Sequence, residues 1–388
     1  MEYTYVPGMV REDKVIKIVF FSNSAWSLLN YRYGLMKTLK NMGFEVIGIA
    51  PYDESVPDIK KEFPFVTLIN FYRKSLNPFV DFKAIVELYQ VYKRIKPDIV
   101  FHYTIKPNIY GSLVSRLLNI NCCNVITGLT YSLLNENSLN ILGRILYKFV
   151  LCSGKKAVFQ NYDDLNVCLL AGIVENNKAI VIKSSGVNTD YFSARYCKNT
   201  RAKDEGFFFL FIARILWDKG AGEFVEACRT VRKLFPMAEG WMVGAVDEGK
   251  KSAVNREQIN EWEAEGIIRY FGITEDVRSF ICKCDVMVLP SYREGTPRTL
   301  LEAMAMERPI ITTDTAGCRQ TVDDGINGFL VPVKDSKSLS DAMIKCVNMS
   351  EDARTRMGVL GREKVLREFD ERLVIESYIR LTDELLSI

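Results

Sequence analysis

The sequence predicts an α/β protein made of two Rossmann-like, doubly wound parallel-sheet domains that face a central cleft. Short runs of β-branched and aromatic residues alternate with longer amphipathic segments, which is typical of parallel sheets covered by helices on both faces. The alternation begins again after residue 206, and a chain of 388 residues is too long for one ordinary core. Two successive sheets with a ligand cleft between them are therefore expected.

The first half of the chain alternates strand-like runs with helical patterns. The strand-like runs are Val15–Phe21, Glu45–Ala50, Phe65–Phe71, Ile99–Tyr103, Asn124–Ile126, Ala157–Gln160 and Ala179–Ile182. The clearest helical patterns are Tyr31–Met42, Val80–Lys96 and Asn108–Leu118, in which apolar residues recur at helical spacing. We expect residues 1–190 to form the N-terminal domain.

The second half repeats this organisation. Its strand-like runs are Phe207–Ala213, Gly240–Gly244, Ile268–Phe271, Val286–Pro290, Pro309–Thr313 and Gly328–Val331. The stretch Thr189–Glu205 is polar with little periodicity, which makes it the best candidate for a linker. Residues 191–369 are expected to form the C-terminal domain, and Asp370–Ser387 predicts a long final helix.

Composition and charge exclude several classes of protein. Hydrophobic residues make up 48% and charged residues 26% of the chain, so it is globular and not disordered. A net charge of +3 gives no indication of nucleic-acid binding. Residues 1–190 hold an excess of basic residues, which indicates either an anionic partner or a chance excess on a solvated face. No signal peptide and no run of about 18 apolar residues is visible, so no membrane span is expected.

The cysteines give no indication of a metal site. There are ten, none in a C-x-x-C pair, and His102 is the single histidine that could complete a zinc set. We expect reduced core cysteines in a cytosolic protein and no bound metal.

The strongest motif is Leu289-Pro-Ser-Tyr-Arg-Glu294-Gly-Thr-Pro297-Arg-Thr-Leu-Leu-Glu302. A buried strand ends at Pro290, and Pro297 stands where a proline is favoured at the start of a helix. The backbone amides of Gly295, Thr296 and the first helical turn would then form an anion site at the carboxyl end of the strand.

Two carboxylates flank this helix start. Glu294 and Glu302 are separated by roughly 12 Å of backbone at ~1.5 Å per helical residue. Paired carboxylates of hydrolases lie about 5–9.5 Å apart, so this spacing argues against hydrolysis. It suits two carboxylates that grip sugar hydroxyls at the two ends of one elongated ligand. The alternative is structural, with Glu294 as a helix cap and Glu302 as a solvated helix residue.

A second motif places two cations after a strand. In Phe211-Ile-Ala-Arg214-Ile-Leu-Trp-Asp-Lys219-Gly220, the strand delivers Arg214 at its carboxyl end and Lys219 follows in the turn. A forked donor and a point charge together are what a diphosphate needs, and they could stabilise a departing nucleoside diphosphate. A surface arginine and a helix-start lysine are the structural alternative.

Motifs of several other enzyme classes are missing. Gly220-Ala-Gly222 is followed by Val225 where a dinucleotide fingerprint needs its third glycine. The chain has no P-loop, no pair of aspartates one residue apart and no nucleophile elbow. A Rossmann dehydrogenase, a P-loop enzyme, a D-x-D metal site and a serine hydrolase are therefore disfavoured.

His102 and Lys106 are the candidates in the first half. His102 lies at the end of the strand Ile99–Tyr103, where it would open into the cleft, and Lys106 follows closely. The pair could hold a phosphate or a hydroxyl of an acceptor. The alternative is that His102 is a structural histidine, which is the commoner situation.

Taken together, these motifs resemble the retaining glycosyltransferases of family 4. The resemblance rests on Ala213-Arg214-x4-Lys219-Gly220 and Glu294-x7-Glu302. It extends to Lys183–Phe192, Val243-Gly244, Phe271-Gly272 and Asp324–Pro332. It implies the glycosyltransferase-B fold, with a donor domain at 191–369 and an acceptor domain at 1–190 to which the helix at 370–388 returns. It also implies transfer with retention, without a metal or a cofactor beyond the nucleotide-sugar substrate.

The resemblance also implies roles for individual residues. The expected donor-binding residues are Arg214, Lys219, Gly244, Ile273, Glu294, Gly295, Thr296, Pro297 and Glu302. Among these, Arg214 and Lys219 would hold the diphosphate, Glu294 the hexose, Glu302 the ribose and Ile273 the base. The expected catalytic residues are Glu294 and His102, and the expected acceptor-binding residues are Asn23, His102, Lys106 and Gly128. Asn23 lies in Ser22-Asn-Ser-Ala-Trp-Ser27, where many relatives carry a double glycine.

A narrower resemblance is to bacterial α-1,3-N-acetylgalactosaminyltransferases that extend undecaprenyl-diphosphate-linked sugars. It rests on Ser75–Val80, Ile182–Val187, Ala213–Gly220 and Leu289–Gly295. It implies transfer of N-acetylgalactosamine from its UDP donor to a lipid-diphosphate-linked sugar, for O-antigen or a related surface polysaccharide. Another donor (UDP-GlcNAc, UDP-Gal or GDP-mannose), a soluble acceptor, or an inactive nucleotide-sugar-binding subunit are the alternatives.

A lipid-linked acceptor would bring the protein to the inner face of the bacterial plasma membrane. Arg73-Lys74 stands beside Leu76, Pro78 and Phe79, and Leu139–Leu151 combines apolar residues with two cations. Either segment could rest on an anionic membrane surface from the cytoplasmic side. For Leu139–Leu151 an ordinary core-facing helix is the alternative.

Overall fold

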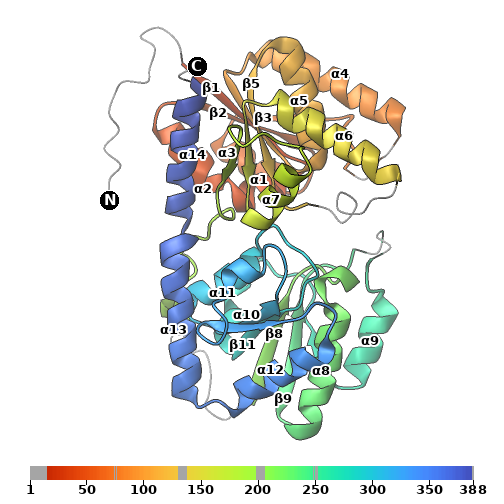
Figure 1. Ribbon diagram of the computed structural model, residues 1–388, viewed down its shortest axis with the longest axis vertical. Helices are drawn as coiled ribbons and strands as arrows, with labels where there is room; N and C mark the ends of the chain where they lie inside the picture. The colour runs from red at the N-terminus through yellow and green to blue at the C-terminus, as the bar shows by residue number, and fades with distance from the viewer. Residues whose placement is uncertain are drawn as a thin grey trace. The chain divides into compact units, whose positions relative to one another are not determined.

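The computed structural model describes residues 15–386 apart from 74, 76, 130–137, 198–205, 248, 250 and 251, and omits the side chains of 138–144. Its chain divides into two compact units (Figure 1). Unit 1 is Met1–Ser185 with Arg372–Ile388, and unit 2 is Gly186–Glu371. Each unit holds one parallel sheet, so the predicted α/β fold with two doubly wound domains is confirmed.

The sheet of unit 1 has seven parallel strands in the order β3-β2-β1-β4-β5-β6-β7. They are β1 Lys17–Phe21, β2 Glu45–Pro51, β3 Phe65–Leu68, β4 Ile99–Tyr103, β5 Asn121–Ile126, β6 Lys156–Phe159 and β7 Ala179–Val181. Its helices are α1 Ala25–Tyr31, α2 Tyr33–Asn41, α3 Val56–Glu62, α4 Pro78–Ile95, α5 Ile105–Leu118, α6 Ser138–Ser153, α7 Tyr162–Leu170 and α14 Glu371–Leu386.

Alternation along β1 divides unit 1 into two cores. Ile18 and Phe20 belong to a cluster with residues of α1, α2, α3 and α14. Val19 and Phe21 belong to a second cluster with residues of α4 and α5. Successive strand residues point to opposite faces, so one strand supplies both layers. Figure 1 shows α4, α5 and α6 together on one side of this sheet and α2, α3 and α14 on the other.

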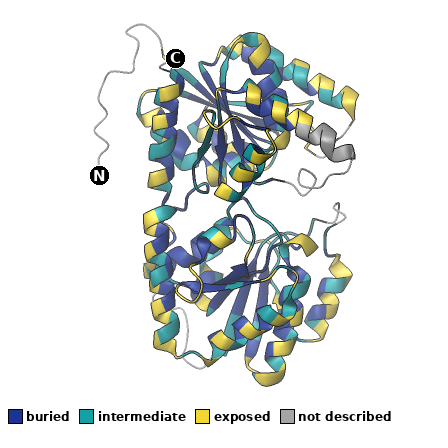
Figure 2. Ribbon diagram, in the orientation of Figure 1, coloured by how far each residue is buried: buried dark blue, intermediate teal, exposed yellow. Residues whose placement is uncertain are grey.

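The sheet of unit 2 has six parallel strands in the order β10-β9-β8-β11-β12-β13. They are β8 Phe207–Ile212, β9 Ala238–Val243, β10 Ile268–Tyr270, β11 Val286–Leu289, β12 Ile310–Thr313 and β13 Gly328–Val331. Its helices are α8 Ala221–Leu234, α9 Arg256–Ala264, α10 Arg278–Lys283, α11 Arg298–Ala305, α12 Ser336–Asn348 and α13 Glu351–Glu368, with 3-10 turns η2 Ala194–Cys197, η3 Trp217–Lys219 and η4 Arg319–Thr321. The strands are largely buried, whereas the helices alternate buried and exposed positions (Figure 2).

The strand orders explain where side chains can gather. In unit 1 the winding reverses between β1 and β4, and in unit 2 it reverses between β8 and β11. Loops that leave two such neighbouring strands part in opposite directions, and the crevice between them is where ligands of open α/β sheets bind. The crevice of unit 2 is therefore bordered by the loops after β8 and β11.

Two expectations from the sequence are wrong. The described part of the predicted linker, residues 189–197, packs against unit 2, because Phe192 is buried in the core of that unit. The cysteines are not all reduced, since Cys197 of η2 and Cys282 of α10 form a disulfide. The other eight cysteines are not disulfide-bonded, and all of them except Cys152 are buried. Among the described residues, no helix has both the length and the apolar character needed to cross a membrane.

Candidate active site

Arg214 lies just beyond the end of β8, at the reversal of the unit 2 sheet. Its Nη1 is 3.6 Å from Oδ2 of Asp247, and within the described residues this nitrogen has no hydrogen-bond partner. The side chain keeps 40% of its surface exposed. A guanidinium that is only loosely paired and still accessible retains donors for an anionic ligand.

Glycine at position 244 allows the loop after β9 to approach Arg214. Gly244 has φ 144° and donates its amide to the carbonyl of Gly272 at 2.8 Å. A Cβ at this position would overlap the carbonyl of Ala213, the residue before Arg214. Any other residue would therefore push the loop away from Arg214.

Lys219 and Glu294 form an ion pair that joins the loops after β8 and β11. Lys219 ends η3 after β8, Glu294 lies in the loop after β11, and Nζ is 2.5 Å from Oε1. Each side chain is 17% exposed, so this ion pair is shielded but still reachable. A diphosphate would compete for the ammonium and a sugar hydroxyl for the carboxylate. The structure thus brings together these two residues from separate motifs.

The residues after Glu294 form a tight turn into α11. Gly295 is buried, Thr296 donates its hydroxyl to the carbonyl of Gly295 at 2.8 Å, and Pro297 is the residue before the first helical residue. The loop after β12 supports this turn, because Gln320 donates its side-chain amide to the hydroxyl of Thr296 at 2.5 Å. The same loop approaches so closely at Gly317 that a Cβ there would overlap the carbonyl of Glu294.

Glu302 is buried on α11 and is not a solvated helix residue. Only 9% of its surface is exposed, and its Oε1 lies 3.1 Å from Nε of Arg298, one turn earlier. Burial raises the pKa of the Glu302 carboxyl to about 7, although the neighbouring Arg298 opposes the shift. A carboxyl with a perturbed pKa beside a candidate binding loop is typical of functional sites.

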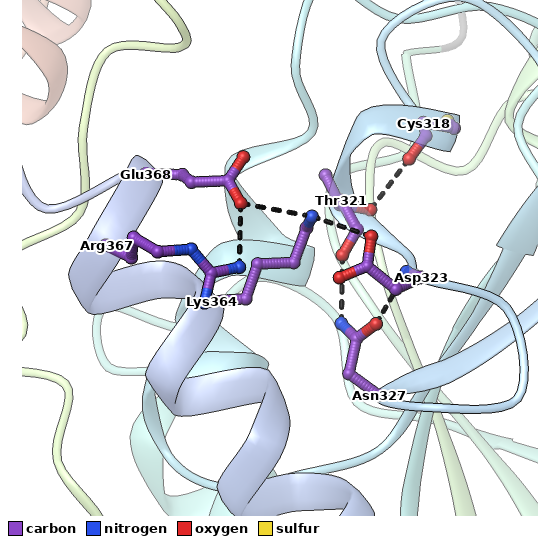
Figure 3. A network of polar contacts seen from close by, with 7 residues as sticks. All are labelled: Cys318, Thr321, Asp323, Asn327, Lys364, Arg367 and Glu368. Carbon is purple, nitrogen blue, oxygen red and sulfur yellow. Dashed lines mark hydrogen bonds and ion pairs between the residues drawn. The ribbon is translucent and has the colours of Figure 1, made fainter.

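A polar network fixes the loop that supports the site (Figure 3). Asn327, 1% exposed, donates to the carbonyl of Thr321 at 3.0 Å and accepts from the amide of Asp323 at 2.7 Å. Lys364 of α13 lies 2.9 Å from Asp323 and 3.3 Å from Glu368. Asn327 of the segment Asp324–Pro332 therefore braces the loop after β12, and Asp323 of this loop joins it to α13. The sequence did not reveal this structural role.

Ile273 completes the donor-side set of candidates. It follows Gly272 at the end of β10 and has 78% of its surface exposed. Single exposed apolar side chains are common on protein surfaces, so this exposure shows only that Ile273 is accessible to a flat base. Its position after the edge strand β10 separates it along the sheet from Arg214 and Glu294.

On unit 1, Asn23 and Gly128 lie where the sequence predicts. Asn23 follows β1 and Gly128 follows β5, with β4 between these strands in the sheet. Both residues are half-buried, and Gly128 has φ 133°. Their roles as acceptor contacts stay a prediction.

His102 lies in the core of unit 1, and the expected catalytic and acceptor-binding roles do not fit this position. It is fully buried, with Nε2 3.1 Å from the hydroxyl of Tyr92 and Nδ1 3.0 Å from Oδ1 of Asn124. Gly111 packs so closely that a Cβ there would overlap the imidazole. Burial lowers the pKa of His102 to about 4, so the ring stays neutral near pH 7. The single histidine is a structural one.

Lys106 is also engaged within unit 1. Its ammonium donates to the carbonyls of Tyr72 and Ser75 and to Oδ1 of Asp81 at 2.9 Å. These three contacts match the three hydrogens of an ammonium group. The expected acceptor contact of Lys106 is therefore wrong in this arrangement, because Lys106 fastens the chain before α4 to α5.

Sequence reasoning missed Asp247, Gly317 and Gln320 around the donor-side residues. All three lie in loops after β9 or β12, whose polar and glycine-containing sequences resemble many ordinary loops. The sequence did carry one signal for them, because loops that follow neighbouring parallel strands lie together at the carboxyl edge of the sheet. That rule identifies the loops, whereas the contacting residues needed the structure.

Comparisons with known proteins match both units. The family described as "Glycosyl transferases group 1" matches residues 206–349, and "Glycosyl transferase 4-like" matches residues 17–161. The N,N'-diacetylbacillosaminyl-diphospho-undecaprenol alpha-1,3-N-acetylgalactosaminyltransferase of Campylobacter jejuni is 28% identical over 96% of this chain and 99% of its own length. The UDP-Gal:alpha-D-GlcNAc-diphosphoundecaprenol alpha-1,3-galactosyltransferase of Escherichia coli is 23% identical over 79% of this chain and 82% of its own length.

Solved structures show the same fold. A glycosyltransferase from Rickettsia africae superposes with a TM-score of 0.77 at 22% identity, covering 96% of this chain and 99% of that one. Anabaena HepE, solved in complex with UDP-glucose, also has a TM-score of 0.77, at 15% identity over 95% of this chain and all of that one. These likenesses establish the two-domain architecture that the sequence motifs imply.

Proposed function

Both halves of the chain match glycosyltransferase families, the first "Glycosyl transferase 4-like" and the second "Glycosyl transferases group 1". We propose that the protein moves N-acetylgalactosamine from UDP-N-acetylgalactosamine to a polyprenyl-diphosphate-linked sugar. The transfer retains the anomeric configuration and forms an α-1,3 linkage. Its product enters an O-antigen or a related surface polysaccharide. The observation that carries this proposal is the Campylobacter jejuni relative, which aligns with this chain over nearly the full length of both.

The two curated relatives support the proposed linkage and acceptor more strongly than the proposed donor sugar. Both are named as α-1,3 transferases that act on sugars linked to undecaprenol through a diphosphate, whereas one transfers N-acetylgalactosamine and the other galactose. The linkage and the acceptor class therefore have support from both relatives, and the donor sugar from one. UDP-galactose is the specific rival donor.

The geometry of unit 2 supports roles for its donor-side residues. Arg214 and Lys219 hold the diphosphate, and their charges offset the negative charge that develops on the departing UDP. Glu294 accepts hydrogen bonds from the transferred hexose, and Glu302 from the ribose. Ile273 covers one face of the base, while Gly244, Gly295, Thr296 and Pro297 shape the backbone around sugar and phosphate.

A panel of nucleotide sugars tests the donor. The purified protein is incubated with UDP-GalNAc, UDP-GlcNAc, UDP-Gal or GDP-mannose and a synthetic polyprenyl-diphosphate sugar, and products are identified by mass. UDP-GalNAc is expected to give the only substantial product. The free sugar without its lipid diphosphate serves as the acceptor control. A product only from another donor, or equal use of the free sugar, would overturn the corresponding part of the proposal.

Substitution of Glu294 tests the site. Glu294→Gln removes the charge that faces Lys219 but keeps the shape, and we expect at least a hundredfold loss of transfer because the sugar loses its carboxylate partner. The matched control is Glu257→Gln, which changes an exposed carboxylate of the same unit on α9. Circular dichroism checks the fold of both variants. Full activity of the Glu294 variant would contradict the assignment.

We also propose that transfer needs no metal ion, because two cationic side chains stand ready for the diphosphate. Arg214→Ala is expected to weaken UDP binding in calorimetry by about tenfold or more, as loss of a charged hydrogen-bond partner usually does. Activity of the wild-type protein should persist in an excess of EDTA. Loss of activity in EDTA that Mg²⁺ restores would refute metal independence without affecting the family assignment.

A lipid-linked acceptor leads us to propose peripheral contact with the cytoplasmic membrane face through the start of α4. Phe79 and Phe82, one turn apart, are 81% and 65% exposed, and the exposed Val86 continues the same stripe. Two exposed cations are near this stripe in the sequence, Arg73 before α4 and Lys83 directly after Phe82. Exposed rings beside cations suit the boundary of an anionic bilayer. Lys74 and Leu76, named from the sequence, lie outside the described residues.

Vesicle flotation tests this contact. We expect the protein to float with vesicles that contain phosphatidylglycerol and to stay unbound with phosphatidylcholine alone. Phe79→Ser with Phe82→Ser should abolish flotation, whereas Leu170→Ser, which changes a side chain on α7 that is 90% exposed, should not. Unchanged flotation of the double variant would show that another surface, such as α6, makes the contact.

A further inference from the structure

A pocket of about 720 Å³ lies in unit 2. It lies against one face of the half of the sheet that is formed by β8, β9 and β10. The register pairs Phe208 with Glu239 and Trp241 with Arg269, so these four side chains project to the same face. The opposite face at this point is covered by α8, because a Cβ at Gly240 would meet Cys228 and Phe224 of that helix. On the face that bears the pocket, α10 covers the sheet only in part, and residues of α10 line the pocket.

Stacked aromatic rings form the floor of this pocket. The rings of Phe208 and Trp241 are stacked with centroids 4.3 Å apart, and Phe271 and Phe280 meet with centroids 4.9 Å apart. Trp241 is 7% exposed, and its indole N–H is already occupied by Glu239 at 3.0 Å. The floor therefore offers ring surface and little hydrogen bonding, which suits a flat or ring-shaped apolar group.

Cations surround the floor. Arg232, Arg269 and Lys283 line the pocket together with one carboxylate, Glu239. Nε of Arg269 lies 3.1 Å from that carboxylate, and the side chain of Arg269 is still 60% exposed. Three positive charges against one negative charge make the rim attractive to an anion, and the exposed side chain of Arg269 keeps this rim accessible.

This pocket is distinct from the candidate active site. Its residues Phe208 and Glu239 lie at the beginning of β8 and β9, whereas Arg214 and Gly244 follow the ends of the same strands. A six-residue strand spans about 20 Å, so Phe208 and Glu239 lie a strand's length from Arg214 and Gly244. The pocket also reaches Phe271, which follows β10 two residues before Ile273, and none of the donor-side candidate residues lines it. The volume falls within the range of about 300–1,000 Å³ that small-molecule sites occupy.

We propose that this pocket is a second ligand site, which binds a small anion that carries a flat or ring-shaped apolar body. The ring rests on the aromatic floor formed by Phe208, Trp241, Phe271 and Phe280, and the anionic group meets Arg269 and Lys283. Cations beside aromatic faces bind anionic rings through both contacts at once. The binding does not depend on which sugar the enzyme transfers.

Two fluorescent probes that share one ring system test this proposal. Anilinonaphthalene sulfonate carries an anionic group, and N-phenyl-1-naphthylamine has the same rings without it. We expect the sulfonate to bind the full-length protein at one saturable site, and the neutral amine to bind at least tenfold more weakly. Saturating UDP should not displace the sulfonate. Equal affinity for both probes, or displacement by UDP, would overturn the proposal.

Substitutions at the rim test whether the sulfonate binds in this pocket. Arg269→Ala combined with Lys283→Ala should weaken sulfonate binding at least tenfold, because both charges leave the rim. Lys233→Ala removes an exposed cation of α8 that does not line the pocket and should leave binding unchanged. Retained UDP binding by the double variant shows that unit 2 is folded. Wild-type sulfonate affinity in the folded double variant would refute the assignment.

Discussion

Burial decides the roles of the two titratable residues that the sequence made most conspicuous. His102 and Glu302 are both largely withdrawn from solvent, yet they differ in their partners. Both ring nitrogens of His102 have side-chain partners, so nothing on it remains for a substrate. Glu302 has Arg298 on one side and lies on the helix that follows the Glu294 turn. A buried carboxyl in that position can respond to a bound ligand.

The pKa of Glu302 predicts a pH dependence of nucleotide binding. Below about pH 7 the carboxyl is largely protonated, and a ribose hydroxyl then loses its anionic acceptor. We expect UDP to bind about tenfold more tightly at pH 8 than at pH 6, as a pKa near 7 requires when only the ionised form binds. Calorimetry at both pH values measures this ratio.

Glu302→Gln is the control, because a glutamine side chain does not titrate. Any effect of the ionisation of UDP itself is the same for the wild type and the variant. The pH ratio of the variant should fall well below that of the wild type. Equal ratios would show that Glu302 does not contact the nucleotide. The raised pKa also means that the contribution of this carboxyl to stability is greatest below about pH 4.5 and is lost as the pH rises through 7.

At the scale of elements, strand ends and glycines bring the donor-side loops together. Gly220 separates η3 from α8 with φ 76°, and a Cβ there would overlap the carbonyl of Pro290, which follows β11. The loops after β8 and β11 can therefore touch only where this side chain is missing. Lys219, the residue before Gly220, reaches Glu294 as a result of this close approach.

Gly220→Ala should therefore destabilise unit 2 by more than the cost of placing an alanine in a left-handed backbone conformation. We expect a loss of at least about 2 kcal/mol in the free energy of unfolding, from the left-handed conformation and from the overlap. Gly325→Ala is the matched control, because Gly325 has φ 74° but no atom near its would-be Cβ. It should cost about 1 kcal/mol. Hydrogen exchange of unit 2 measures both, and equal losses would contradict the packing argument.

At the scale of the whole molecule, the two chain ends share one core. Residues of α14 are buried in the cluster that contains Ile18 and Phe20 of β1, with Tyr378 and Leu381 at 1% and 2% exposure. The carbonyl of Leu385 also accepts a hydrogen bond from Asn121 at 3.3 Å. Unit 1 therefore cannot complete its core until the last helix has been synthesised.

Leu381→Ala should weaken unit 1 and spare unit 2. Loss of a buried leucine costs about 2–5 kcal/mol, depending on how far the cavity collapses. Hydrogen exchange monitored by mass spectrometry should show reduced protection in β1 and β4 and unchanged protection in β8 and β11. Leu373→Ala, at a position 38% exposed on the same helix, should have an effect below about 1 kcal/mol. An equal loss of protection in both units would show that they unfold together.

The fold class, nearly every strand and the donor-side candidates could be predicted from the sequence alone, because alternating periodicities and motifs at strand ends are local signals. Arg214 and Lys219 both follow β8, and Lys219 pairs with Glu294, which follows the neighbouring strand β11. The burial of His102, the engagement of Lys106, the Cys197–Cys282 disulfide and the ion pair of Asp323 with Lys364 of α13 became visible only in the folded protein. Each of these depends on which distant side chains surround a residue, and no local pattern in the chain encodes those neighbours.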